Sequence, residues 1–324
     1  MTTPTPRLAR LAWATLAYNV LVILWGAFVR ATGSGAGCGA HWPLCNGEVV
    51  PRSPSVATLI ELTHRATSGA ALILALVLYL AARQATPAGS SVRRAAVWVV
   101  VLELMEGAVG AIIVLLRYVG TDASAERTFS VAAHLTNTFF LLVVLVITAL
   151  RASGVARPAA PSAARRRLVA LSVGLSVVVG IAGAITALGD TLFPAESLAS
   201  GLAQDASPTA HFLVRLRVIH PLMATLTALV LAGVAGTATL GSPSPLLKRS
   251  AIAVVVTQLA QIACGVVNLV MLAPVPMQML HLLFADLAWI ALVVFSDRFL
   301  GAPVSARHAP LQDVGEADPR PGGR

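Results

Sequence analysis

Residues 61–82 read ELTHRATSGAALILALVLYLAA, an apolar run that begins with two charged residues and a histidine. A helix needs about 20 predominantly apolar residues to cross a bilayer, and this run is long enough. Eight such runs occur along the chain, so we expect an all-α polytopic membrane protein. The eight predicted transmembrane helices span residues 11–30, 59–82, 95–116, 128–150, 168–188, 213–236, 250–272 and 278–297.

Composition supports this class and indicates an orientation. The chain is 57% hydrophobic and 11% charged, against roughly 25% charged residues in soluble domains. Seven basic residues fall on one side of the predicted membrane, and the other 16 of the 23 fall on the side of the termini. The positive-inside rule then places both termini in the cytoplasm, as expected of a multi-pass plasma-membrane protein. This topology explains the net charge of +9, so no nucleic-acid partner is expected.

The chain resembles itself at an offset of about 155 residues. At an offset of 155, Glu103 falls on Gln258, Glu106 on Gln261 and Gly110 on Gly265. At offsets of 156 and 147, His64 falls on His220 and His134 on His281. An Ala-, Pro- and Arg-rich segment at residues 151–167 is typical of a linker between the two halves. We therefore predict two pseudo-symmetric four-helix bundles, an N-terminal half at residues 1–155 and a C-terminal half at residues 156–324.

Four of the seven histidines lie near the outer ends of the even-numbered spans, namely His64, His134, His220 and His281. Imidazole is a good ligand for iron, copper and zinc, and the interior of a helix bundle is a usual cofactor site. We predict one heme site in each half, held by His64 with His134 and by His220 with His281. The alternative for each is a packed, hydrogen-bonded histidine. The other three histidines, His41, His211 and His308, are expected to be solvated.

A charged residue precedes the first histidine of each half by three positions, which places the two on one helix face. A charge inside the membrane costs about 2.5–3.5 kcal/mol on insertion scales, so it indicates a function or a specific pairing. Arg217, before His220, is suited to pair with a heme propionate. Glu61, before His64, is suited to act as a general base or to stabilise developing positive charge. The alternative for Glu61 is a simple ion pair with Arg65 or Arg30.

Two of the three cysteines, Cys38 and Cys45, lie in the first external loop, in the sequence CGAHWPLC. An oxidising exterior favours a disulfide between them, and two free thiols are the alternative. Cys264 lies within a predicted helix and is expected to be a packing residue.

Other buried groups are harder to interpret. Glu103, Glu106 and Asp286 lie within predicted helices. They could relay protons, or they could be protonated groups that are hydrogen-bonded between helices, which is the interpretation we favour. Several glycines are expected to mark tight helix packing, namely Gly107, Gly110, Gly180, Gly183 and Gly265.

These residues together resemble the heme A synthase family. The run GAFVRATGSGAGCGAHWPLCNG at residues 26–47, followed by ELTHR at 61–65, is similar to the first external loop and second helix of these enzymes. The remaining motifs follow in the same order, with AAHLTN around His134, RVIHPL around His220 and MLHLLFAD around His281. The resemblance covers about residues 11–297. One departure is Glu106, since the family pattern has a glutamine near this position. The cysteine pair places the chain in one branch of the family.

The resemblance implies an oxidoreductase that converts the C8 methyl of heme O to a formyl group, giving heme A for terminal cytochrome oxidases. It implies that His64 and His134 bind the substrate heme in the N-terminal half. It also implies that His220 and His281 bind a resident heme b in the C-terminal half. Glu61 matches the catalytically important acid of the family, and Cys38 with Cys45 match its disulfide. A heme O synthase and the assembly of cytochrome oxidase are the expected partners, besides membrane lipid. The sequence leaves open whether the protein forms a homo-oligomer.

Two other functions fit parts of the sequence. A two-heme b-type electron carrier between quinol and an outer acceptor would use the same four histidines, but it has no need of a carboxylate beside one heme. A transporter or heme exporter would be consistent with the repeat alone and would retain no heme tightly. The heme A synthase hypothesis predicts stepwise oxidation of the methyl to an alcohol and then to a hydrated aldehyde, with the porphyrin carrying the redox chemistry.

Overall fold

The structure is a computed structural model, and it describes residues 6–158, 160–240, 242 and 244–302. The N-terminal half contains α1 (Pro6–Ala31), the short 3-10 helix η1 (Ser34–Ala36), α2 (Val56–Ala85), α3 (Ser91–Leu115) and α4 (Ala125–Ala152). The C-terminal half contains α5 (Ala163–Leu192), α6 (Leu198–Ala206), α7 (Phe212–Arg215), α8 (Ile219–Thr239), α9 (Pro245–Val270) and α10 (Val275–Gly301). Apart from one isolated bridge between Cys45 and Glu48, the described part of the chain has no β-structure.

Eight helical segments in the described residues are long and apolar enough to cross a membrane, with α7 and α8 forming one segment. The prediction of eight spans is therefore confirmed. The helices extend a few residues beyond the predicted apolar runs because serines cap them outside these runs. A serine side chain accepts a hydrogen bond from a backbone N–H of the first turn and so stabilises the start of the helix. Such caps are Ser55 for α2, Ser90 for α3, Ser124 for α4, Ser162 for α5 and Ser244 for α9.

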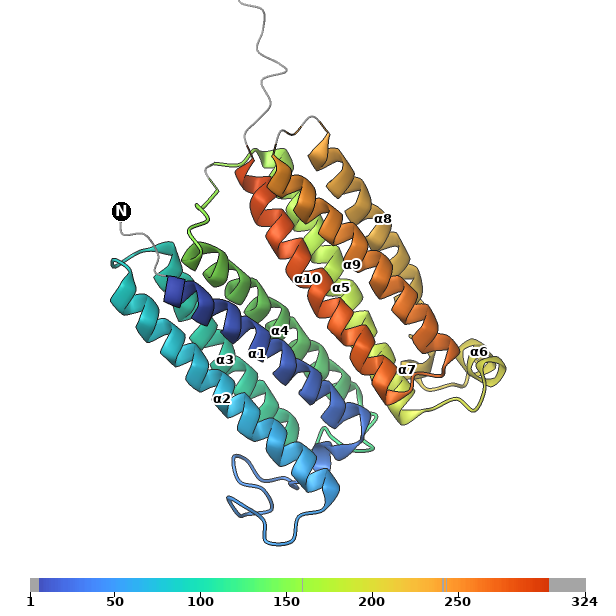
Figure 1. Cartoon of the computed structure of the whole chain (residues 1–324). Coiled ribbons are helices and arrows are strands. Elements are labelled where there is room, and N and C mark those ends of the chain that lie inside the picture. Colours follow the sequence, from blue (N-terminus) through green and yellow to red (C-terminus); the bar gives the residue numbers. More distant parts are fainter. Residues whose placement is uncertain (1–5, 159, 241, 243, 303–324) are drawn as a thin grey trace, which may run out of the picture.

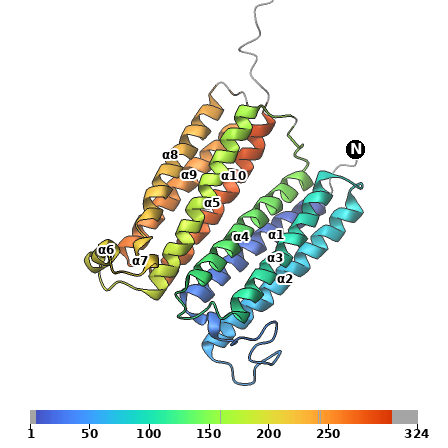
Figure 2. The same cartoon turned by 180° about the vertical axis from the view of Figure 1, so that it is seen from behind.

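The long helices lie side by side in two groups (Figures 1 and 2). Helices α1–α4 form one group, and α5 and α8–α10 form the other. The connection between α4 and α5 lies at one end of the molecule, which we call the linker end. The loops that carry η1, α6 and α7 lie at the opposite end, which we call the loop end.

The two groups contact each other through α1, α4, α5 and α10. The Phe139 and Trp289 rings lie 4.6 Å apart, and the Trp289 indole N–H donates to the Phe139 carbonyl at 3.0 Å. Gly180 on α5 makes room for this contact, since a Cβ there would overlap the Phe139 ring. Near the loop end, Arg30 of α1 donates to the Ala187 carbonyl and to the Gln278 side chain. The groups are thus joined by both aromatic packing and polar contacts.

A buried ion pair joins the groups at the linker end. Arg151 of α4 pairs with Asp297 of α10, and each residue is only 6% exposed. Arg151 also donates to the carbonyls of Val155 and Ala156, at 3.4 and 3.2 Å. The ion pair therefore fixes both the packing of α4 on α10 and the direction in which the linker leaves α4.

Replacing Arg151 by alanine is expected to destabilise the protein strongly, because Asp297 would keep a buried charge without a partner. Removal of one member of a buried ion pair costs about 3–5 kcal/mol of unfolding free energy. Thermal unfolding of the purified protein in detergent would show this as a lower melting temperature. Arg94→Ala is the matched control, because Arg94 is exposed near the same end of α3 and forms no ion pair in the described residues. An equal drop for both variants would contradict the prediction.

Candidate functional site

The four histidines of the repeat all lie toward the loop end of their helices. His64 is in the third turn of α2 and His134 in the third turn of α4. His220 is in the first turn of α8 and His281 in the second turn of α10. The structure therefore brings two histidines of each helix group to the same end of the molecule.

The two C-terminal histidines face one another. The ring centroids of His220 and His281 are 6.4 Å apart, and the ring planes are nearly perpendicular, at 84°. An imidazole nitrogen binds a first-row metal at about 2 Å, so two imidazoles on opposite sides of one ion have centroids about 6 Å apart. The observed separation would allow His220 and His281 to hold one iron between them. Among the described residues there is no cluster of three or more metal-binding side chains.

Glycines give three of the histidine rings their space. A Cβ added at Gly26 of α1 would lie 2.8 Å from the His64 ring. A Cβ at Gly183 of α5, or at Gly265 of α9, would lie 2.9 Å from the ring of His220 or His281. Close packing was predicted for Gly180, Gly183 and Gly265 and is confirmed, although the link to the histidines was missed. The same prediction is wrong for Gly107 and Gly110, where an added Cβ would meet nothing within 4 Å in the described structure.

In the N-terminal half, His134 contacts an acidic residue of the neighbouring helix. His134 Nδ1 lies 2.6 Å from Glu106 Oε2 of α3, and the Thr138 hydroxyl of α4 donates to Glu106 Oε1 at 2.8 Å. The expected hydrogen bond between helices is thus confirmed for Glu106 through Thr138, whereas its expected protonation stays a prediction. Glu103 Oε1 and Asp286 Oδ2 are buried without a hydrogen-bond partner in the described residues.

Glu61 is buried at the base of the first loop, and both of its carboxylate oxygens are engaged. Oε1 pairs with Arg65 at 2.5 Å, and Oε2 accepts the backbone N–H of Cys38 at 2.7 Å. Arg65 also donates to the carbonyls of His41 and Leu44. The ion pair with Arg65 is therefore present, and a catalytic role for Glu61 stays a prediction. The pair with Arg30 is wrong, because Arg30 reaches the C-terminal half instead.

Cys38 and Cys45 form a disulfide, and both are fully buried. The alternative of two free thiols is therefore wrong. The loop packs on the start of α2, where the Thr58 hydroxyl donates to the Gly37 carbonyl at 2.8 Å. Cys264 is a buried free cysteine, as predicted for a packing residue. The disulfide, Glu61 and Arg65 together fix the loop over the end of α2 that carries His64.

Arg217 lies in a break between α7 and α8. Pro221, in the first turn of α8, has no N–H for the carbonyl of residue 217, and its ring would clash with that carbonyl in a continuous helix. The Arg217 guanidinium lies 3.1 Å from Asp190 and 3.9 Å from Asp205, and it donates to the Gly189 and Phe193 carbonyls. The sequence analysis missed both carboxylates. A propionate would have to share Arg217 with them, so that role remains a prediction.

The loop residues around Arg217 are also ordered by their neighbours. Burial raises the pKa of the Asp205 carboxyl, and the nearby Arg217 opposes this shift. His211 stacks on Phe193 at 4.9 Å, and its Nδ1 accepts the Leu213 N–H at the start of α7. The prediction that His211 is merely solvated is therefore wrong, whereas His41 is exposed as expected. His308 lies outside the described residues.

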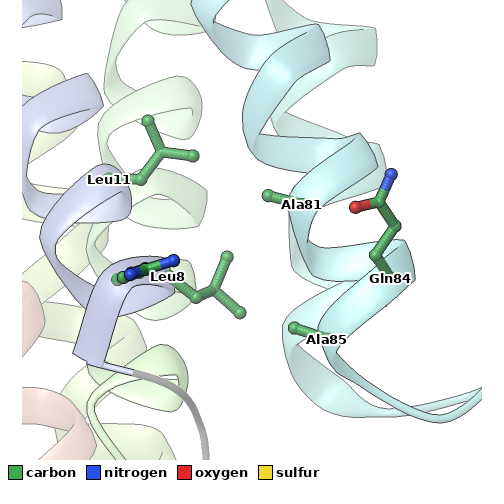
Figure 3. A pocket seen from close by; sticks show the side chains of 6 residues that line it. Leu8, Leu11, Ala81, Gln84 and Ala85 are labelled. Atoms are coloured by element: carbon green, nitrogen blue, oxygen red, sulfur yellow. The ribbon is translucent and has the colours of Figure 1, made fainter.

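A shallow pocket lies away from the histidines, between the first turns of α1 and the last turns of α2 (Figure 3). Its lining consists of Arg7, Leu8, Leu11, Ala81, Gln84 and Ala85. These residues are at the linker end, whereas His64 is at the other end of α2. The pocket is therefore separate from the candidate heme sites.

Comparison with known proteins identifies the family of the chain. Residues 9–293 match the family model COX15-CtaA, described as cytochrome oxidase assembly protein. The chain belongs to this family. Over 59 residues, 18% of this chain and 19% of the relative, it is 59% identical to a heme A synthase of Bacillus cereus strain AH187. The predicted membership of the heme A synthase family is confirmed.

A longer match is to a differently named protein. Over 319 residues the chain is 45% identical to a protoheme IX farnesyltransferase of Thermus thermophilus, and the proteins of two strains of this organism match equally well. The match covers 98% of this chain but 52% of each relative, so the chain spans about half the length of these relatives.

Proposed function

We propose that this COX15-CtaA family member is a heme A synthase, which oxidises the C8 methyl of heme O to a formyl group to give heme A for terminal cytochrome oxidases. The observation that carries the proposal is the match of residues 9–293 to the COX15-CtaA family. The facing pair of His220 and His281, with a centroid separation of 6.4 Å, suits a heme iron. The comparison with a Bacillus heme A synthase supports the same activity. The chain is then an oxidoreductase of heme biosynthesis.

The two halves have separate tasks in this proposal. Residues 1–155 bind the substrate heme through His64 and His134, and residues 156–324 hold a resident heme b through His220 and His281. A pseudo-symmetric relation between the halves is supported by the contacts of Gly26 with His64 and of Gly183 with His220. These contacts recur at nearly the same offset as the histidines themselves.

We also propose that the linker end faces the cytoplasm of a plasma-membrane protein, with both termini on that side. The basic residues concentrate at the linker end, as the positive-inside rule requires. The Cys38–Cys45 disulfide lies at the loop end, and an oxidising exterior is where disulfides persist.

The bound heme of the C-terminal half would supply one-electron redox chemistry, which the protein side chains cannot provide. The chain's own residues hold and orient the substrate. Glu61, one turn before His64, carries a buried negative charge beside the substrate site. In each of the two oxidations, to the alcohol and then to the hydrated aldehyde, a C–H bond would be replaced by a C–O bond to a water oxygen. Two electrons would leave to an acceptor outside this chain, and two protons would be released. We assign Glu61 the role of taking one of these protons, and the hydrated aldehyde then loses water to leave the formyl group.

The substrate requires a supplier in the membrane, because a farnesylated heme is strongly apolar. The Thermus relatives are named for a farnesyl transfer to protoheme, and the chain matches only about half of their length. We propose that a heme O synthase delivers heme O to this chain by lateral contact within the bilayer.

A two-heme b-type electron carrier is the second candidate, because two histidine pairs alone would suit it equally. The first experiment to separate the two is extraction and chromatography of the hemes bound to the purified protein. The protein would be made in cells with and without a co-expressed heme O synthase. We expect one heme b per chain without the synthase, and heme b plus heme O or heme A with it. Two hemes b per chain in both cases would contradict the synthase and favour the carrier.

A further inference from the structure

Equivalent positions of the repeat place different groups beside the histidine of the last helix in each half, and they contact different nitrogens of its ring. In the N-terminal half, Glu106 Oε2 lies 2.6 Å from His134 Nδ1. In the C-terminal half, Gln261 Nε2 lies 3.3 Å from His281 Nε2. Glu106 and Gln261 coincide when the chain is offset by 155 residues. One site therefore has a carboxylate beside Nδ1 of its histidine. The other has a neutral amide beside Nε2, and its Nδ1 has no hydrogen-bond partner among the described residues.

The carboxylate is also held more firmly than the amide. The Thr138 hydroxyl donates to Glu106 Oε1 at 2.8 Å, and Thr138 lies on α4 one turn after His134. The same hydroxyl lies 3.0 Å from the His134 carbonyl. The helix that carries the histidine thus also positions the carboxylate. By contrast, Gln261 Oε1 is buried without a hydrogen-bond partner among the described residues.

This difference has a consequence for a bound iron. A carboxylate beside the second ring nitrogen of a metal-binding histidine makes that histidine a more basic ligand, and the 2.6 Å contact places Glu106 there. Stronger donation to the iron stabilises its oxidised form, and hydrogen bonds to axial ligands are one of the ways a protein sets a heme potential. Because Glu106 contacts Nδ1 of His134, Nε2 of the same ring is the nitrogen left to bind the iron. A neutral glutamine adds no charge to the ligand, so its effect on the iron is smaller.

We propose that Glu106 is a positioning residue that lowers the reduction potential of a heme iron bound by His134 relative to one bound by His281. The inference rests on the proposed binding of one heme in each half. Its consequence is a direction for electron transfer between the sites. A single electron would pass from ferrous iron at His134 to ferric iron at His281, so that the first iron is oxidised and the second is reduced.

The test is a redox titration of the purified, heme-loaded protein, followed by electron paramagnetic resonance. The signal that appears only when a heme O synthase is co-expressed belongs to the N-terminal site. Glu106→Gln is expected to raise the potential of that signal and to leave the other unchanged. A tenfold change in the ferric-to-ferrous equilibrium corresponds to about 59 mV for one electron, and we expect a shift of at least this size.

Two further variants supply the reciprocal change and the control. Gln261→Glu is expected to lower the potential of the C-terminal signal. Glu103→Gln removes an acidic side chain one turn from Glu106. Unlike Glu106, Glu103 forms no hydrogen bond or ion pair with His134 in the described structure. Glu103→Gln is therefore expected to shift the N-terminal potential less than Glu106→Gln does. Equal shifts for these two variants would overturn the assignment to the His134 contact.

Thr138→Val covers the case in which Glu106→Gln loses heme. It keeps the carboxylate but removes the hydroxyl that holds it, so we expect a smaller shift in the same direction. Two bound hemes with unchanged potentials in both variants would overturn the inference while the proposed function stands. A wild-type chain that never gains a second heme with the synthase present would instead contradict the proposed function.

Discussion

Replacing His281 by alanine is expected to abolish retention of the resident heme, lowering heme b from one per purified chain to less than about a tenth of that. In the proposed C-terminal site, the facing rings of His220 and His281 would both bind the heme iron. Loss of one imidazole ligand would leave the iron with a single protein ligand, so the heme would dissociate more readily. His220→Ala is expected to have the same effect. Heme content is measured by extraction and absorption of the pyridine complex, normalised to protein.

The matched control is His211→Ala. His211 also lies at the loop end of the C-terminal half, but it stacks on Phe193 and caps α7 rather than facing His281. We expect this variant to keep its heme b. If the His281 and His220 variants each retained a full heme, the assignment of the C-terminal ligands would be wrong. If His211→Ala lost its heme as well, the loss would reflect general damage to the loop end.

The membrane architecture could be predicted from the sequence because it depends on local composition. Run length and hydropathy identified the eight spans, since a bilayer requires about 20 apolar residues whatever their partners are. The predicted helices were too short at their ends, because the helices continue to serine caps such as Ser55 and Ser162, beyond the apolar runs. A polar residue that caps a helix contributes nothing to a hydropathy signal.

The pairing of His220 with His281 could also be predicted, because the repeat supplied a second copy of the pattern. The partners of charged residues could not. Arg217 meets Asp190 at the end of α5 and Asp205 in α6, and α6 belongs to a connection in which no span was expected. The contact between Glu106 and His134 depends on how two helices are rotated against one another, and that rotation is set by packing.

One missed feature did leave a signal in the sequence. Gly26 and Gly183, which make room for His64 and His220, are separated by almost the same offset as the two histidines. Considered singly, each glycine looks like a general packing residue of a membrane helix. Considered as a pair that recurs with the histidines, they indicate a site that needs a flat ring close to the helix backbone.

Glu61 has two roles in this proposal, and a single substitution at Glu61 would not separate their effects. Its carboxylate holds Arg65 and the Cys38 N–H, and so fixes the disulfide loop. It also places a negative charge one turn from His64, where we propose that it accepts a proton. The two roles predict different results for Glu61 and Arg65. If loop fixation were the whole function, loss of either partner would reduce activity equally.

Glu61→Gln is expected to lower conversion of heme O to heme A by about 10²-fold or more, within the range of 10²–10⁴ usual for a general base. Both hemes should remain bound, because glutamine keeps an oxygen to accept the Cys38 N–H. Arg65→Gln is the matched control and is expected to lose far less activity, since it leaves the carboxylate in place. The measurement is the heme A yield, by chromatography of heme extracts from cells that co-express a heme O synthase. Full conversion by Glu61→Gln would exclude its catalytic role, and equal losses in both variants would assign Glu61 to the loop alone.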